Sequence, residues 1–313
     1  NSETFSNFFK KNRDFVNYDA KKNDRKVVIY TTCFVNFNKQ NTGVAALKVL
    51  KKNGVEVQEA YPGCCGMPFL EQADLPKVVD QAKKVSKDLL EWVDKGYKVI
   101  TLTASCGLML KFEWPLLLPN NENVKKLSSN VMDIDEYVVD IANNEGLADG
   151  LQEIDSGVTV HHACHARAQN MGIKARDMLK HIPKVKIDVV EKCAGHGGTF
   201  GVMKETHDLA NKVGRPTARQ IKTKNNKYMA SDCPLAGKHL KQLVRHQIES
   251  YNNFVTYQIP KTISMFNPVN IKSDKLYDEK SGKNALEIFI TFDNFKLSIF
   301  LSSRYSILIL NCF

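Results

Sequence analysis

Short apolar runs rich in β-branched residues recur along the chain, and each of them leads into a loop that carries a cysteine. Runs of this length, bounded by glycine or polar residues, are typical of strands buried in a sheet. Amphipathic segments between them predict helices over 44–53, 75–95 and 204–212, the first two closed by Gly54 and Gly96. The predicted strands and their cysteines fall in residues 26–33, 55–65, 98–106, 157–164, 185–193 and 227–233. Strands that alternate with helices predict an α/β fold with parallel sheets.

The order of the cysteines indicates an internal duplication. Three cysteines recur after 131, 128 and 127 residues: Cys33 as Cys164, Cys65 as Cys193 and Cys106 as Cys233. Because the carboxyl ends of neighbouring parallel strands meet at one edge of a sheet, we expect the cysteines of each half to converge there. The sequence therefore predicts two duplicated cysteine-rich halves, each with a small parallel sheet flanked by helices, related by a pseudo-two-fold axis.

A polar, glycine-containing stretch at 143–157 separates the two halves. After the second half the pattern changes, because residues 287–300 alternate apolar and polar positions and so predict a β-hairpin or edge strands. No function follows for this tail or for Cys312 within it. The predicted organisation is a connecting segment at 1–24, a first cysteine-rich domain at 25–150, a second at 151–257 and a C-terminal tail at 258–313.

Composition and charge narrow the class of protein. The 313 residues suffice for about two domains, and 43% hydrophobic with 25% charged residues is typical of a soluble globular chain. The net charge of +10 comes from lysines scattered over predicted helix faces, not from an arginine-rich stripe, which argues against nucleic-acid binding. A basic surface of this kind suits an acidic partner protein or an anionic membrane surface.

Neither a membrane span nor an export signal is expected. Charged residues interrupt the longest apolar stretch, 285–310, and the N-terminus has no apolar signal core. Eight cysteines in a chain of this size, without an export signal, indicate metal binding or redox chemistry in a reducing compartment. We therefore expect a cytoplasmic protein.

The cysteine motifs resemble a known family. "TTC", "CCG" and "SCG" in the first half, followed by "HHACH", "CAGHGGTFG" and "SDCP" in the second, are similar to two copies of the cysteine-rich "CCG" domain. This domain occurs in the B subunit of heterodisulfide reductase, in succinate and lactate oxidation proteins, and in the C subunit of anaerobic glycerol-3-phosphate dehydrogenase. The resemblance is closest to the last of these and covers about residues 5–257.

The resemblance implies iron–sulfur chemistry, with the cysteines of each full copy holding a cluster. Members of the family often carry an N-terminal ferredoxin-like segment with further cysteine runs. None is present here, and the chain begins at Asn1 without a methionine, so we expect it to be a piece of a longer protein.

In the first half, the resemblance assigns four cysteines to a cluster, and four thiolates suffice for a [4Fe–4S] cluster. They are Cys33, Cys64, Cys65 and Cys106. Each copy in the family ends in C-x-x-C, which this chain lacks. Four buried structural cysteines are the alternative, but their positions at strand ends and in a Gly/Pro loop favour a metal site.

In the second half, Lys192 replaces the first member of the doublet, and this leaves the set one ligand short. Either a histidine completes the set or one iron stays open to substrate or solvent. Three cysteines and one histidine also suit zinc. The cysteines are Cys164, Cys193 and Cys233, and the candidate histidines are His162, His165 and His196.

The resemblance implies an electron-transfer subunit, an oxidoreductase component that links a flavin-dependent dehydrogenase to the respiratory quinone pool. The expected partners are a flavoprotein that oxidises glycerol 3-phosphate or a similar small hydroxy compound and a quinone or membrane electron acceptor. No flavin or nicotinamide fingerprint occurs in the chain itself. This function places the protein at the inner face of the cytoplasmic membrane as a peripheral subunit.

Two alternatives stay open. One is a heterodisulfide-reductase-like enzyme that acts on a disulfide at an open cluster iron. The other is a zinc-stabilised interaction module without redox function. A Cys–His nucleophile pair around Cys164 is disfavoured, because no oxyanion-hole signature accompanies it.

Overall fold

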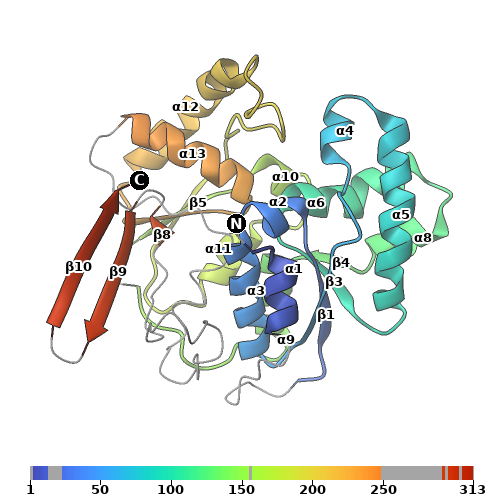
Figure 1. Ribbon diagram of the computed structural model, residues 1–313, viewed down its shortest axis with the longest axis horizontal. Coiled ribbons are helices and arrows are strands. Elements are labelled where there is room, and N and C mark those ends of the chain that lie inside the picture. Colours follow the sequence, from blue (N-terminus) through green and yellow to red (C-terminus); the bar gives the residue numbers. More distant parts are fainter. Residues whose placement is uncertain are drawn as a thin grey trace.

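The computed structural model describes residues 3–12, 23–154 and 157–247 and three strands within 291–312 (Figure 1). In the first half, four strands form a parallel sheet in the order β2-β1-β3-β4. The β-branched run of β1 is buried on both faces, as a central parallel strand requires. The strands are β1 (Lys26–Tyr30), β2 (Glu56–Ala60), β3 (Lys98–Thr101) and β4 (Val131–Asp133).

Helices cover this sheet, and the two helices predicted here end near the glycines that were expected to close them. Gly54 and Gly96 have φ values of 76° and 85°, a left-handed conformation that favours glycine. The helices are α1 (Phe5–Lys11), α2 (Cys33–Phe37), α3 (Gln40–Lys52), α4 (Met67–Glu71), α5 (Leu75–Val93), α6 (Ala104–Leu108), a π-helical turn (Met109–Glu113), α7 (Trp114–Leu117), α8 (Glu122–Ser128) and α9 (Ile134–Asn144).

The second half repeats the plan with three parallel strands in the order β6-β5-β7. Its described residues contain no counterpart of β4. The prediction of an α/β fold with two small parallel sheets is confirmed. The elements are β5 (Val158–His161), α10 (Cys164–Arg167), α11 (Lys174–Leu179), β6 (Ile187–Val190), α12 (His207–Thr223), β7 (Tyr228–Ser231) and α13 (Pro234–Gln247).

The prediction of a helix over 204–212 was wrong in its bounds, because α12 begins at His207 and continues to Thr223. Residues 201–206 form turns instead, held by hydrogen bonds such as that from the Thr206 hydroxyl to the Phe200 carbonyl. Within the helix, Gly214 allows the backbone of Ala194 to approach closely. A Cβ on Gly214 would lie 2.4 Å from the Ala194 carbonyl oxygen.

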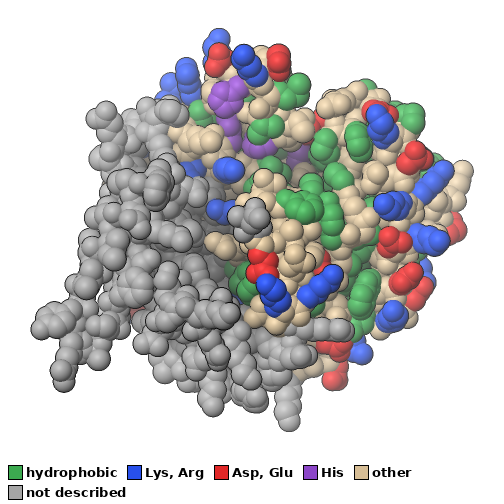
Figure 2. Space-filling view, in the orientation of Figure 1, with side chains coloured by type: hydrophobic (Ala, Val, Ile, Leu, Met, Phe, Trp, Pro, Cys, Tyr) green, Lys and Arg blue, Asp and Glu red, His purple; other side chains and the backbone are tan. Residues whose placement is uncertain are grey.

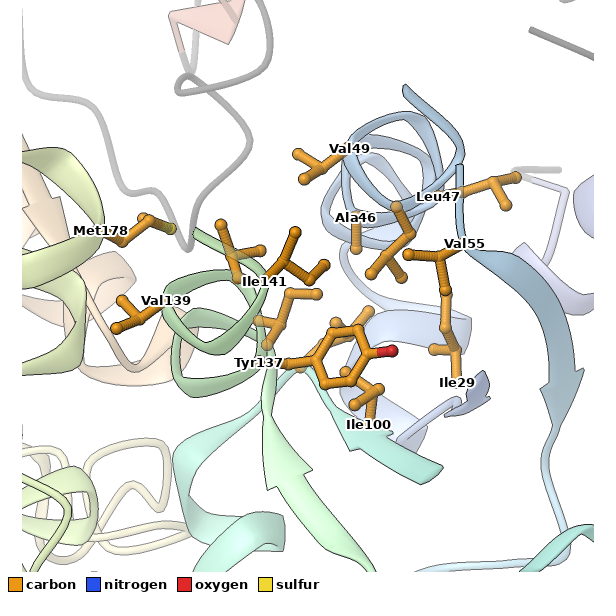
Figure 3. Close-up of a cluster of buried hydrophobic side chains, with 14 of the residues drawn as sticks. Ile29, Ala46, Leu47, Val49, Val55, Ile100, Tyr137, Val139, Ile141 and Met178 are labelled. Atoms are coloured by element: carbon orange, nitrogen blue, oxygen red, sulfur yellow. The ribbon is translucent and has the colours of Figure 1, made fainter. Parts of the chain in front are cut away.

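The largest core cluster joins the two halves. It contains side chains from β1, β3 and α3 of the first half, from α9, which follows the first sheet, and from β5 and α11 of the second. Figure 3 shows Ile141 and Tyr137 of α9 between Ile29 on one side and Met178 on the other. The halves are therefore packed on one another through a continuous apolar interior.

Three antiparallel strands are described in the tail: β8 (Thr291–Phe292), β9 (Phe295–Ser302) and β10 (Tyr305–Cys312). The β8–β9 pair confirms the hairpin predicted from the alternating pattern. The rest of the predicted tail, residues 258–290, lies outside the described residues. Within the described ranges, no helix combines the length and the apolar character needed to cross a bilayer.

Candidate functional site

The four cysteines of the first half lie together, although they come from three different strand ends. Cys33 begins α2 after β1, the Cys64–Cys65 doublet follows β2, and Cys106 lies in α6 after β3. The Sγ atoms of Cys65 and Cys106 are 3.3 Å apart. Side-chain hydrogen bonds also join Cys33 to Cys64 and Cys64 to Cys65. These four thiols, here called the first cysteine set, form one continuous group.

The first cysteine set favours a thiolate at Cys64. Hydrogen bonds from the thiols of Cys33 and Cys65, helped by backbone N–H groups, lower the pKa of Cys64 to about 3. The hydrogen bond with Cys64 and burial raise the pKa of Cys33, and the hydrogen bonds with Cys106 and Cys64, together with burial, raise the pKa of Cys65. The thiolate is the form of cysteine that binds metal, so the lowered pKa of Cys64 favours it as a ligand.

Buried hydrogen bonds hold the backbone of the cysteine doublet. The hydroxyl of Tyr30, which is fully buried, donates to the Gly63 carbonyl at 2.7 Å. The indole N–H of Trp114, also fully buried, donates to the Cys65 carbonyl at 3.0 Å, and the Gly66 N–H lies 3.4 Å from the Cys64 sulfur. The sequence patterns did not single out Tyr30 or Trp114, because each is one apolar residue within a buried segment.

The second set, Cys164, Cys193 and Cys233, surrounds a cavity with about 400 Å³ of empty space, including its opening to solvent. Cys164 begins α10 and Cys193 follows β6, and both are exposed. Cys233 lies just before α13, where burial raises its pKa to about 12. Two of the three cysteines of the second set are therefore open to solvent, whereas Cys65 and Cys106 of the first set are buried.

The candidate histidines occupy different positions around this cavity. His165 and His196 line it, and His162 does not. The Nδ1 atom of His162 lies 2.5 Å from a carboxylate oxygen of the buried Asp232. His161 reaches the cavity, but the Ser231 hydroxyl and the Lys192 carbonyl lie 2.9 Å from its two ring nitrogens.

His196 differs from these because its buried Nδ1 atom has no hydrogen-bond partner among the described residues. Burial and the neighbouring His239 ring, whose centroid is 5.9 Å away, lower the pKa of His196 to about 4. The ring is therefore neutral at neutral pH, which is the form that binds metal. His165 and His196 are thus the candidates that the geometry places beside the three cysteines.

The donor chemistry of both sets fits a thiolate-bound metal group. Across the described residues, however, no three Cys, His, Asp or Glu side chains have the spacing that a single metal ion requires. Four thiolates around a tetrahedral zinc ion would have sulfurs about 3.8 Å apart, and the sulfurs of Cys65 and Cys106 are 3.3 Å apart. The inference of a metal group therefore depends on the chemistry of the cysteine and histidine side chains, and not on the distances between them.

A comparison with protein families identifies the repeated unit. The model of the cysteine-rich domain, CCG, matches residues 27–111 and again 158–241. The chain belongs to this family. The two matches begin within the first strand of each half and include all seven cysteines of the two sets, so the resemblance seen in the motifs is confirmed.

Curated relatives of this CCG-domain chain include an iron-sulfur protein and subunits of a reductase and a dehydrogenase. An iron-sulfur protein of Methanococcus maripaludis is 28% identical over 80% of the chain and 48% of that protein. The B subunit of the fumarate reductase (CoM/CoB) of Methanothermobacter marburgensis is 29% identical over 69% and 42%. The C subunit of the Escherichia coli anaerobic glycerol-3-phosphate dehydrogenase is 28% identical over 66% and 52%. The chain spans about half the length of these relatives.

Proposed function

We propose that the chain is an iron–sulfur electron-transfer unit of an oxidoreductase complex. The observation that carries this proposal is the convergence of four thiols from three strand ends. The names of the similar proteins, an iron-sulfur protein and subunits of a fumarate reductase and a dehydrogenase, support it. In finer terms, the chain would connect a flavin-dependent dehydrogenase for glycerol 3-phosphate or a similar compound to the quinone pool.

The first cysteine set would hold one [4Fe–4S] cluster through Cys33, Cys64, Cys65 and Cys106. The second set would hold another through its three cysteines, with His165 or His196 beside the remaining position. A bound cluster supplies one-electron chemistry. The residues of the chain would position the ligands. Tyr30 holds the carbonyl of Gly63, just before the cysteine doublet, and Trp114 holds the carbonyl of Cys65 within it.

Such a unit would be located in the cytoplasm and would dock peripherally at the membrane that contains the quinone. The net charge of +10 supports this location, because the inner membrane surface is anionic. The flavoprotein partner would supply the electrons, since the chain carries no dinucleotide fingerprint of its own.

The test is an assay of iron and acid-labile sulfide on protein purified without oxygen. We expect a brown protein whose visible absorption bleaches when dithionite reduces it. A colourless protein that contains stoichiometric zinc would contradict the proposal and favour an interaction module instead. Because zinc has no redox chemistry, the two outcomes cannot be confused.

A second candidate function is reduction of a disulfide at the second cysteine set. The specific observation in its favour is the open cavity in which exposed Cys164 and Cys193 meet two histidines. Sustained release of thiols from a disulfide substrate by the reduced, purified protein would favour this enzyme over a pure electron carrier. Absence of thiol release while a quinone analogue is reduced would exclude it.

A further inference from the structure

A carboxylate from the first half holds the loop that carries Cys193 in the second half. Residues 193–201 connect β6 to the turns before α12, and their glycines lie beside the second cysteine set. Glu71, at the end of α4, accepts two hydrogen bonds from Thr199 of this loop. The backbone N–H donates at 2.9 Å and the hydroxyl at 3.0 Å.

The contact is close enough to exclude a side chain. A Cβ on Gly198 would lie 1.6 Å from Oε1 of Glu71, so a larger residue there would displace the carboxylate from its present position. Gly197 and Gly198 also have φ values of +46° and +54°, which favour glycine. The high glycine content of this loop does not match the spacing of a phosphate-binding loop. It has a structural explanation instead, because it allows the close contact between Glu71 of the first half and Thr199 of the second.

Both residues of this contact lie close in sequence to cysteines of the two sets. Glu71 ends the short helix α4, and the N-cap of α4 is Gly66, whose N–H points at the sulfur of Cys64. Thr199 lies six residues after Cys193, and Gly197 and Gly198 between them line the cavity. A movement of the loop would therefore change the distance of Cys193 from Cys164 and Cys233.

The first half also contributes a residue to the lining of the second cavity. Ser105, the neighbour of Cys106, lines the cavity directly. The second site is thus assembled from both halves, although the duplication suggested that each half would build its own.

We propose that Glu71 is a positioning residue for the second cysteine set, which is incomplete without the first half. Its carboxylate holds the 193–201 loop so that Cys193 faces the cavity together with Cys164 and Cys233. That the set holds a metal cluster rests on the proposed function. That Glu71 orders the loop does not, and the two statements are tested separately.

The first experiment uses metal-free, reduced protein and follows deuterium labelling of the backbone amides in the 193–201 loop by mass spectrometry. Glu71→Ala removes the carboxylate oxygen that accepts both hydrogen bonds, and we expect labelling of the loop to become about tenfold faster, as the loss of about 1.4 kcal/mol predicts. Glu71→Gln keeps an acceptor oxygen and should label at nearly the wild-type rate. The matched control is Glu91→Ala, an exposed glutamate on α5, which should change nothing.

Labelling of the loop at the same rate in wild type, Glu71→Ala and Glu71→Gln would overturn the positioning role. If Glu71→Gln behaved like Glu71→Ala, the charge and not the hydrogen-bond geometry would be responsible, and the proposal in its present form would be wrong. Equal acceleration of the amides around the buried Cys233 would indicate general loosening of the fold, which also contradicts it.

The second experiment asks whether positioning matters for metal binding. Cys65→Ser is used as the background, since it disables the first set and leaves iron bound by the second set as the only signal. We expect iron content and visible absorption to fall at least twofold when Glu71→Ala is added, and to recover with Glu71→Gln. Equal iron and equal spectra in all three proteins would refute the positioning role and leave the proposed function intact. A second set without iron in the Cys65→Ser background would instead contradict the proposed function there, while the labelling experiment would still decide the role of Glu71.

Discussion

Cys65 lies at the centre of the first cysteine set, in contact with Cys64 on one side and Cys106 on the other. Cys65→Ser replaces a soft thiolate by a hydroxyl, which binds iron poorly. We expect the variant to lose about one cluster of iron and sulfide per chain while the second half stays folded, as measured by metal assay and circular dichroism. Cys312→Ser, in the tail strand β10, is the matched control and should keep its full iron content. Unchanged iron in Cys65→Ser would contradict the assignment of the doublet.

Tyr30 offers a test of how the cysteine loop is held. Tyr30→Phe removes only the hydroxyl that donates to the Gly63 carbonyl, inside a fully buried site. The unpaired carbonyl should lower the free energy of unfolding by about 1–2 kcal/mol, measured by urea denaturation of the metal-free protein. Tyr61→Phe, at a half-buried position nearby, should have a smaller effect. Equal unfolding midpoints for wild type and Tyr30→Phe would show that the hydrogen bond does not stabilise the loop.

His196 predicts acid sensitivity of the metal-free protein. Its pKa is about 4 in the folded state, against 6.5 for an unperturbed ring, because burial and His239 disfavour its charged form. Between these two values the unfolded chain binds a proton that the folded chain does not, so stability decreases as the pH falls through this window. His196→Gln should therefore flatten the pH dependence of the melting temperature between pH 7 and 5. His181→Gln, at an exposed position, should leave the slope as in wild type.

At the residue scale, the positions of the cysteines could be predicted and the surroundings of the histidines could not. Each cysteine follows an apolar run whose strand character is local in the sequence, so its place at a sheet edge follows from topology. The state of a histidine ring depends on partners that are distant in the sequence. His161 lies opposite Ser231 and His162 opposite Asp232, each 70 residues away. The pattern of apolar and polar residues in the sequence does not predict such pairs, and it does not predict the contact of Glu71 with Thr199.

At the scale of elements, six strands of the two parallel sheets and the helices α3, α5 and α12 were predicted, whereas β4, the longer helices α9 and α13 and the short helices that begin beside the cysteines were not. The helices α2, α6 and α10 have five, five and four residues, too few for a helical pattern to show. They place the cysteine in a first turn. In α2 the Thr32 hydroxyl caps the helix by accepting from Val35 N–H at 3.3 Å. The start of α12 was wrong because local hydrogen bonds, from Thr206 to the Phe200 carbonyl and between His207 and the Gly201 carbonyl, hold residues 201–206 in turns.

The helix α6 can be displaced by a single methyl group. A Cβ on Gly107 would lie 2.0 Å from Oδ1 of Asp133, a buried carboxylate that also accepts hydrogen bonds from Thr101 at 2.5 Å and Gln169 at 2.8 Å. Gly107→Ala should cost about 2–3 kcal/mol of stability by overpacking. Because α6 carries Cys106, the variant should also lose iron from the first set.

Gly96→Ala is the control that separates displacement of α6 from a general loss of stability. Its iron content and its free energy of unfolding in urea are measured in parallel with those of Gly107→Ala. Gly96 has nothing within 4 Å of its added Cβ, although its φ of +85° makes alanine strained. We expect Gly96→Ala to lose stability through backbone strain alone and to keep its iron. Full iron in Gly107→Ala would show that the position of α6 does not control Cys106.

At the scale of the whole molecule, the duplication in the sequence suggests two separate modules. The structure instead has one hydrophobic cluster to which both halves contribute side chains. The helix α9 follows the first sheet and packs against α11 of the second half, and its side chains Tyr137 and Ile141 belong to the shared core (Figure 3). On the surface, the histidine side chains visible in Figure 2 gather at the end of the molecule formed by α12 and α13. The sequence repeat therefore accounts for the strands and the cysteines. It does not account for the interface between the halves or for the histidine-rich end of the molecule.

If the halves share one core, they should unfold together. Leu89 is fully buried in a cluster whose members all belong to the first half, and Leu240 is fully buried in a cluster centred on the second. Leu89→Ala and Leu240→Ala should each cost about 2–5 kcal/mol. In native-state hydrogen exchange, the slowest amides of β1 and of β5 should then accelerate by the same factor in either variant, because both open only through global unfolding. Acceleration confined to β1 in Leu89→Ala and to β5 in Leu240→Ala would show two independent folding units, and the shared core around α9 would then contribute too little to join them.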